Sequence, residues 1–283
     1  MLLEDKLKHT GLFLFKWRSY LPLILVILLF IKLNNFSSFF KSPSNDFFYE
    51  MFCLAVSFLG VFMRSLSIGF ITPGTSGRNT DAHVASVLNS TGMYSITRNP
   101  LYLGNFFIFS GVMLLFQSWE FLVLNSLIFI LFYVPIILSE EKYLLEKFGD
   151  EYKNYAESVP CIIPRFARWE KPNKPWNWKM VMGREHDTGF ATIASFFILV
   201  PARMYFSTGS SHLELIWVII GSVGFCSWLT LDDAAKSQEN YIVLELECSF
   251  IHVPHPLIPS PRGRGAHSRL DVRFPLARAQ RGE

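Results

Sequence analysis

Apolar residues in this chain of 283 residues gather in long blocks, where a soluble protein would interleave them with polar residues. A helix needs roughly 20 mostly apolar residues to cross a bilayer, and slightly fewer when it is tilted. Six blocks approach this length, at residues 20–33, 47–71, 102–116, 121–138, 189–205 and 213–231. Only residues 117–120 separate the third block from the fourth, which predicts an antiparallel helical hairpin. We therefore predict an all-α, polytopic transmembrane protein of about six spans, with this hairpin at its centre.

Composition supports this class of protein. Charged residues make up 17% of the chain, against about 25% in soluble domains, and the mean hydropathy is +0.29. These values exclude an intrinsically disordered protein and argue against a soluble globule. The net charge of +3 is too small to indicate a nucleic-acid partner. The four cysteines lack ligand-like spacing, so we predict no disulfide framework and no metal site.

Lys and Arg are distributed unevenly between the two sides of the predicted membrane. With the N-terminus inside, the inner flanks hold 15 of these residues and the outer loops hold only Lys32 and Lys41. This bias predicts that both termini are cytoplasmic. No small-x-small cleavage site follows the first block, which favours a retained span over a signal peptide.

The chain divides into four predicted parts. Residues 1–46 form an N-terminal span and outer loop, 47–166 a membrane core, and 167–236 an interfacial segment with two further spans. Residues 237–283 are rich in Pro, Arg, Gly and His near their middle, and we predict a disordered tail. Within the tail, residues 255–265 resemble translated bacterial repeat DNA, which points to read-through and to a bacterial inner membrane. A basic tail that touches anionic lipid is the functional alternative.

One polar segment precedes the third block. Asn99 followed by Pro100 is typical of a helix start, because Asn is a good N-cap and Pro is favoured at the first helical position. The free N–H groups of that start, with Arg98 beside them, predict a site for a carboxylate or phosphate. Gly104 leaves space for a neighbouring helix or a ligand. The alternative is that Arg98 is a topological anchor and Asn-Pro a simple cap.

A second polar segment, Ser139-Glu140-Glu141, ends the fourth block. Adjacent carboxylates at a helix C-terminus are unfavourable, because that end carries partial negative charge, and a cationic ligand would relieve the cost. The alternative is a solvated boundary with Lys142 as the partner. Residues 142–159 then carry apolar side chains at helical spacing, which predicts an amphipathic helix at the cytoplasmic interface. Tryptophans among prolines in 164–178 predict a further interfacial segment.

The predicted hairpin places both polar segments at its open, cytoplasmic end. A ligand between an anion site and a carboxylate pair must carry both charges, and S-adenosylmethionine does, with a carboxylate, an ammonium, a sulfonium and ribose hydroxyls. NADPH would need more positive charge, and no Walker or GxGxxG loop occurs. Within the second block, Glu50 and Arg64 either face a polar cavity or snorkel to the interface. We favour snorkelling for Glu50 and leave Arg64 open.

Together these motifs extend into a longer pattern. It reads Gly92-x-Tyr94, Arg98-Asn99-Pro100-x-Tyr102-x-Gly104, then Glu140-Glu141, Phe148-Gly149, Tyr152, Tyr155 and Val159-Pro160. Over roughly residues 50–166 the chain resembles the isoprenylcysteine carboxyl methyltransferase and phospholipid methyltransferase superfamily. The resemblance implies an integral membrane enzyme that binds S-adenosylmethionine at the cytosolic face. It also implies a lipid or lipid-linked acceptor that enters sideways from the bilayer.

The resemblance implies a site, residue by residue. Cofactor contacts fall on Leu88, Asn89, Tyr94, Asn99, Pro100, Leu101, Tyr102, Gly104 and Glu140. We predict that Arg98 positions an anion, that Glu140 binds a hydroxyl or ammonium, and that Glu141 orients the acceptor or takes its proton. Two positions depart from the family. Asn99 replaces a His, which removes any proton shuttle, and Ile136 replaces an Arg of the isoprenylcysteine enzymes, which argues against a prenylcysteine carboxylate acceptor.

Two other functions stay open at this point. Sterol reductases share a related hairpin and use NADPH, although their second motif differs from Ser139-Glu140-Glu141. The second alternative is that the chain keeps the fold of these enzymes but is a membrane protein without catalytic activity. The sequence does not select among a carboxylate, phosphate, amine or thiol acceptor, and it gives neither the oligomeric state nor a role for the last two spans.

Overall fold

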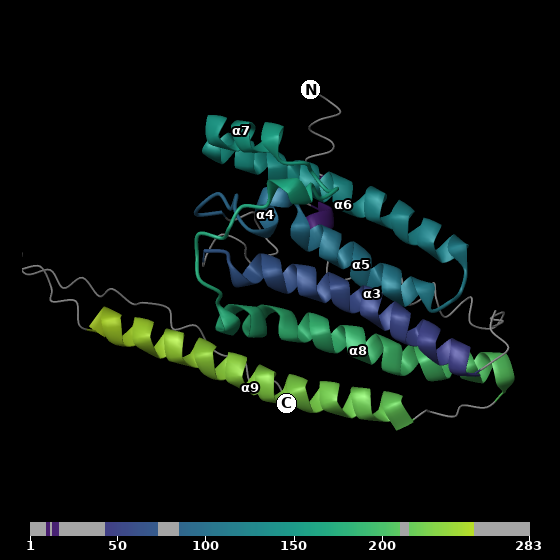
Figure 1. Cartoon of the computed structure of the whole chain (residues 1–283). Helices are drawn as coiled ribbons and strands as arrows, with labels where there is room; N and C mark the ends of the chain where they lie inside the picture. The colour runs from purple at the N-terminus through teal and green to yellow at the C-terminus, as the bar shows by residue number, and fades with distance from the viewer. Residues whose placement is uncertain (1–9, 12, 17–42, 73–84, 210–214, 252–283) are drawn as a thin grey trace, which may run out of the picture. The chain divides into compact units, whose positions relative to one another are not determined.

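A computed structural model of the chain describes residues 10–11, 13–16, 43–72, 85–209 and 215–251 (Figure 1). Within these ranges the chain forms helices and no strand, which confirms the predicted all-α class. The helices are α3 (Pro43–Gly69), α4 (Met93–Ile96), α5 (Pro100–Leu114), α6 (Trp119–Phe148), α7 (Asp150–Ser158), the 3₁₀-helix η1 (Phe166–Arg168), α8 (Trp178–Thr208) and α9 (Leu215–Ile251). The predicted first span, residues 20–33, lies outside the described residues.

Four of these helices are long and apolar enough to cross a membrane. They are Ser44–Gly69 of α3, Trp119–Phe148 of α6, Trp178–Phe206 of α8 and Leu215–Ala234 of α9. The helix at the third predicted span, α5, has only 15 residues. It rises about 22 Å at 1.5 Å per residue, less than the ~30 Å thickness of the hydrocarbon core. The polytopic class is therefore confirmed, with four long apolar helices and one short one among the described residues.

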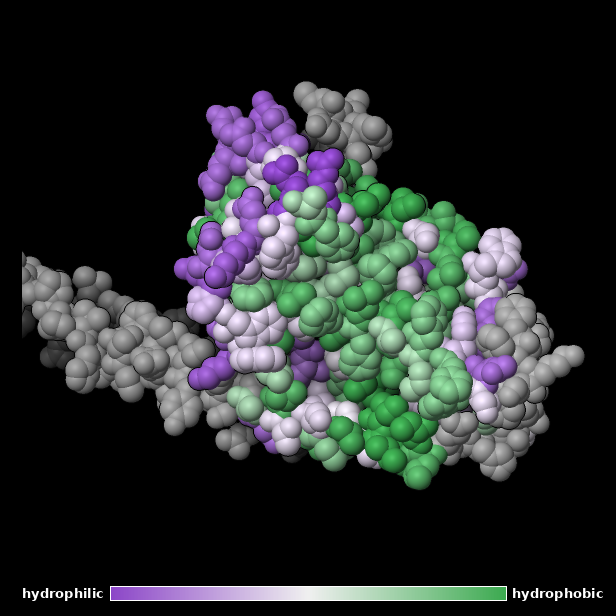
Figure 2. All heavy atoms as spheres, in the orientation of Figure 1, coloured by the Kyte–Doolittle hydropathy of each residue, from purple (hydrophilic) through white to green (hydrophobic). Residues whose placement is uncertain are grey.

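The outer surface agrees with a membrane environment. Figure 2 shows apolar residues over most of the visible face and hydrophilic residues gathered at the end where α7 lies. Large side chains such as Phe52, Phe62, Leu131 and Ile198 are more than half exposed. An apolar surface this extensive is unfavourable in water and is what lipid tails would cover.

Small residues bring α3 and α5 into close contact. A Cβ atom added to Gly104 would lie 2.8 Å from the carbonyl oxygen of Gly60 and 2.5 Å from Cγ of Arg64. One added to Gly111 would lie 2.1 Å from Oγ of Ser57. Backbones approach this closely only where side chains are small. Of the two roles predicted for Gly104, the structure therefore shows the approach of a neighbouring helix.

Glycine also divides the predicted interfacial helix in two. We expected one amphipathic helix over 142–159, but α6 continues through Phe148 and α7 begins at Asp150. Gly149 lies between them with φ +54° and ψ −125°, a conformation that is essentially restricted to glycine. The apolar spacing continues through this break, which is why the sequence pattern predicted a single helix.

The segment after α7 crosses over α4 and the start of α5. Its backbone pairs with them at several points, since Arg98 N–H donates to the Pro160 carbonyl at 2.9 Å and Gly92 N–H donates to the Glu170 carbonyl at 3.0 Å. The Trp176 ring fills the space over Gly69 and packs against Phe70 with ring centroids 5.0 Å apart. We call residues 160–177 the strap. The strap ties the ends of α3, α4 and α5 together.

Buried ion pairs join the long helices. Glu50 of α3 is 4% exposed and pairs with Arg203 of α8, and Trp217 of α9 donates Nε1–H to Glu50 Oε2 at 3.1 Å. The preferred prediction that Glu50 snorkels was therefore wrong, because its carboxylate turns inward to a cation and an indole. Arg64, left open, also turns inward and pairs with Glu185 of α8, with 2.7 Å between Nη2 and Oε1.

The last helix extends further than the sequence pattern predicted. The sixth predicted span covers residues 213–231, but α9 continues to Ile251. Residues 252–283 lie outside the described residues. The chain divides into two units, Met1–Glu239 and Asn240–Glu283, so the end of α9 belongs to the second unit. The four-part division and the origin of the tail stay predictions.

Candidate active site

Helix α5 begins at the predicted residues, but its predicted side-chain cap is not formed. Asn99 occupies the N-cap position and Pro100 the first helical position. The Asn99 side chain makes no capping hydrogen bond, and its Nδ2 instead donates to the Cys161 carbonyl of the strap at 3.1 Å. The prediction that Asn99 caps α5 was therefore correct in position and wrong in contact. In the first turn, Pro100 has no N–H and the Leu103 N–H donates to the Asn99 carbonyl at 3.1 Å.

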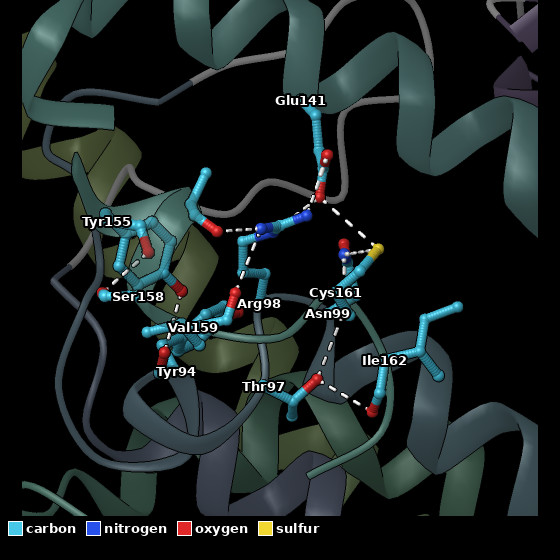
Figure 3. Close-up of polar contacts among 11 residues, drawn as sticks. Tyr94, Thr97, Arg98, Asn99, Glu141, Tyr155, Ser158, Val159, Cys161 and Ile162 are labelled. Atoms are coloured by element: carbon cyan, nitrogen blue, oxygen red, sulfur yellow. Dashed lines mark hydrogen bonds and ion pairs between the residues drawn. The ribbon is translucent and has the colours of Figure 1, made fainter. Parts of the chain in front are cut away.

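Arg98 and Glu141 form a two-point ion pair beside this helix start (Figure 3). Arg98 Nε lies 2.8 Å from Glu141 Oε1, and Arg98 Nη2 lies 3.3 Å from Oε2. The third nitrogen, Nη1, donates to the carbonyls of Ala156 and Val159. The side chains are 15% and 20% exposed. Arg98 therefore fastens the end of α7 to both helices of the hairpin, which is more than a topological anchor would do.

Several neutral polar groups lie near this ion pair (Figure 3). Cys161 Sγ is 3.6 Å from Glu141 Oε1 and equally far from Asn99 Nδ2. The Thr97 hydroxyl lies 3.0 Å from the Ile162 carbonyl, and Tyr155 Oη donates to the Tyr94 carbonyl at 2.8 Å. The positive and negative charges of the ion pair balance, so this part of the site is polar without net charge.

Tyr94 lies within electrostatic range of Glu140 in the neighbouring part of the site. Burial raises the pKa of the Tyr94 phenol above its ordinary range, and the negative charge of Glu140 raises it further. The positive charges of Arg64 and Arg184 oppose this effect. The pKa direction keeps Tyr94 protonated at neutral pH. The site therefore has a second half, in which a neutral, buried tyrosine lies within electrostatic range of a carboxylate and two guanidinium groups.

A hydrogen-bond network centred on Arg64 adjoins this second half of the site. Arg64 binds Glu185 through Nε and Nη2, both at 2.7 Å, and donates Nη1–H to Asn105 Oδ1 at 2.7 Å. Asn105 in turn donates to Tyr133 Oη at 3.2 Å. The network connects α3, α5, α6 and α8, and it fixes the position of the Arg64 guanidinium.

The structure assigns other predicted residues mainly to packing. Pro100 is fully buried, and the Tyr102 ring lies 5.2 Å from that of Tyr133. Leu101, on the same turn of α5, is half-buried. Leu88 and Asn89 are half-buried in the irregular segment before α4, and their cofactor contacts stay predictions.

Ile136 lies away from the polar groups. It is 1% exposed and belongs to an apolar cluster with Phe129, Tyr133 and Ile137. An apolar residue at this position therefore packs into the interior of the hairpin.

Sequence reasoning missed Arg184, Glu185, Tyr152 and Cys161 as site residues. The fifth apolar block begins at residue 189, whereas α8 begins at Trp178 and brings Arg184 and Glu185 into the bundle. The Arg64–Glu185 pair could have been found from the sequence. Arg64 lies inside one predicted span, and Glu185 lies shortly before another, so the two opposite charges were candidates for pairing. Tyr152 and Cys161 gave no such signal. Tyr152 belonged to the family pattern and to the predicted amphipathic helix without a role of its own, and Cys161 lacked ligand-like spacing.

We expect the Cys161 thiol to react slowly with iodoacetamide at pH 8. Burial and the charge of Glu141 raise the pKa of this thiol, and only the thiolate is nucleophilic. The reaction rate should rise as the pH is raised further. Mass spectrometry of the alkylated peptides measures it, with the same cysteine in the denatured protein as the comparison. Equal rates for folded and denatured protein at pH 8 would contradict the assignment.

The fold and these contacts define a class: a polytopic helical membrane protein with a polar site at one end of a short hairpin. Residues 21–151 match the family model described as phospholipid methyltransferase. Over this part of the chain, the match and the relatives below confirm the predicted resemblance to the superfamily of isoprenylcysteine and phospholipid methyltransferases.

Three curated relatives show how far the similarity reaches. A protein-S-isoprenylcysteine O-methyltransferase of Schizosaccharomyces pombe is 32% identical over 121 residues, 41% of this chain and 50% of that protein. Its counterpart in Saccharomyces cerevisiae is 36% identical over 115 residues, 40% and 47%. A nickel-cobalt-cadmium resistance protein of Alcaligenes xylosoxydans xylosoxydans is 30% identical over 126 residues, 44% and 56%. The chain thus spans about half the length of these relatives. No solved structure matches it significantly.

Proposed function

We propose that the protein is an S-adenosylmethionine-dependent methyltransferase that acts on a lipid or lipid-linked acceptor at the cytosolic face of the membrane. The observation that carries the proposal is that the α5 start and the Arg98–Glu141 pair lie at one end of the hairpin, where Glu140 is within electrostatic range of Tyr94. Two relatives are named as isoprenylcysteine methyltransferases, which supports the reaction type. The excess of Lys and Arg in the inner flanks supports cytoplasmic termini and a cytosolic site.

The residues present fit this cofactor. The first turn of α5 offers backbone N–H groups and a positive dipole end to a carboxylate, and the Asn99 side chain does not occupy them. The Glu140 carboxylate suits an ammonium or ribose hydroxyl, and Tyr94 beside it supplies an aromatic wall. Asn89, Leu88 and Leu101 would complete the contact. No group of three metal-ligating side chains occurs among the described residues.

The cofactor supplies an electrophilic methyl group, so the protein mainly has to align the acceptor atom and exclude water. Glu141 faces this region and orients the acceptor or takes its proton. Arg98 acts through Glu141, because its guanidinium is held by that carboxylate and by two backbone carbonyls. Arg98 is therefore better described as a positioning residue than as the anion-binding group that the sequence suggested.

Replacing Glu140 by Gln should abolish methyl transfer. The substitution keeps the shape but removes the negative charge that holds the cofactor's ammonium or hydroxyl groups. The measurement is incorporation of a labelled methyl group from S-adenosylmethionine into membrane lipids, followed by separation of the products, which also identifies the acceptor.

The matched control for this experiment is Glu157→Gln, at an exposed position of α7. It should leave methyl transfer unchanged. Undiminished turnover in Glu140→Gln would remove Glu140 from the site. Thermal stabilisation by NADPH, but not by S-adenosylhomocysteine, would point to a reductase.

A further inference from the structure

Tyr152 of α7 carries a buried hydroxyl that has no hydrogen-bond partner among the described residues. The side chain is 4% exposed, and its Oη atom makes no hydrogen bond to any residue that the structure describes. Tyr155, three residues further along α7, is the natural comparison because its hydroxyl donates to the Tyr94 carbonyl at 2.8 Å. Buried hydroxyls are normally hydrogen-bonded, so the difference between these two tyrosines needs an explanation.

The Tyr152 hydroxyl lies beside the charged pair of the candidate site. Its surroundings include Glu141, Arg98 and Cys161. The Glu141 carboxylate comes near the phenol and, besides burial, raises its pKa, but the two groups do not have the geometry of a formed hydrogen bond. Burial raises the pKa of this phenol, and the Glu141 charge raises it further, so the group is a donor and not a base at neutral pH. Both Glu141 oxygens accept from Arg98, and the Tyr152 hydroxyl forms no hydrogen bond of its own with them among the described residues.

An unpaired buried hydroxyl destabilises the protein, and a phenylalanine would fill the same space without that cost. The hydroxyl is therefore explained by a group that reaches it from outside the chain. We propose that Tyr152 donates a hydrogen bond to a lone-pair-bearing atom of a bound ligand, next to the Arg98–Glu141 pair. The ligand is the cofactor or the methyl acceptor, so this inference rests on the proposed function.

The test compares Tyr152→Phe with Tyr155→Phe in the full-length protein in detergent micelles. Without ligand, Tyr152→Phe should have a thermal midpoint equal to or above that of the wild type, because it loses no hydrogen bond. Tyr155→Phe should have a lower midpoint, because its bond to Tyr94 is lost. If the hydroxyl contacts the cofactor, Tyr152→Phe should weaken binding of S-adenosylhomocysteine about tenfold. If it contacts the acceptor, S-adenosylhomocysteine binding should persist while the acceptor KM rises or kcat falls by a similar factor.

Each outcome bears on one proposal or both. Wild-type protein that neither binds S-adenosylhomocysteine nor transfers a methyl group overturns the proposed function and this inference with it. Wild-type activity that Tyr152→Phe leaves unchanged, in both binding and turnover, overturns the inference alone. A ligand-free Tyr152→Phe protein as destabilised as Tyr155→Phe also overturns it, since the hydroxyl would then have a partner within the chain.

Discussion

Arg203→Met should destabilise the protein by about 3–5 kcal/mol, a cost typical of removing one partner from a buried ion pair. The Arg203 and Glu50 side chains are each 6% exposed, so the remaining carboxylate would have little access to water. Arg203 also donates to the Leu115 carbonyl at 2.8 Å, and this acceptor would lose its partner as well. The Trp217 indole would remain as a neutral donor to Glu50 and would compensate only in part. Unfolding of the purified protein in mixed micelles measures the change.

The double variant Glu50→Gln with Arg203→Met serves as the comparison, because it removes the stranded charge. It should recover most of the lost stability, since replacing both partners costs much less than removing one. Lys153→Met, at an exposed position of α7, controls for the loss of a cation and should change little. A single Arg203→Met variant within about 1 kcal/mol of the wild type would show that this ion pair does not hold α3 to α8.

The apolar blocks predicted the long helices because a span in lipid must satisfy its backbone internally and carry apolar side chains throughout. The same pattern contains no information on how spans rotate about their axes or which residues meet. Glu50 pairs with Arg203, and Arg64 pairs with Glu185. These pairs form because close contacts such as that of Gly60 with Gly104 fix the register of α3 relative to its neighbouring helices. Register is a property of packing between helices, and one sequence does not reveal it.

The site shows the same division between local and long-range information. Pro100 begins α5 as predicted, because the fixed φ of proline and its missing N–H act within one turn. The contact of Asn99 was not predictable, since its acceptor, the Cys161 carbonyl, is brought in by the strap from 62 residues away. Tyr152 appeared as one apolar member of a helix face, and only the environment of its hydroxyl distinguishes it from Tyr155.

Arg98→Lys should reduce methyl transfer by about 100-fold, although the charge is kept. A guanidinium presents several donors in a fixed plane, whereas an ammonium is a compact charge that cannot match them all. Arg98 binds both oxygens of Glu141 and two carbonyls at the end of α7, so a lysine would lose at least two of these bonds. Bonds to charged groups contribute about 1.5–3 kcal/mol each, and a total near 3 kcal/mol corresponds to the expected factor. The thermal midpoint should fall as well.

Turnover with labelled S-adenosylmethionine, measured beside Arg165→Lys at an exposed position of the strap, tests this prediction. Arg165→Lys should retain full activity. The orientation of the chain in the membrane depends on positive charge, which lysine keeps, and does not depend on the geometry of the guanidinium group. Arg98→Met combined with Glu141→Leu should be more stable than Arg98→Met alone, since no carboxylate is left unpaired. If Arg98→Lys is as active and as stable as Arg165→Lys, Arg98 serves only as a topological anchor. The orientation of Glu141 must then come from other contacts, and the Cys161 thiol, 3.6 Å from its Oε1, is the first to examine.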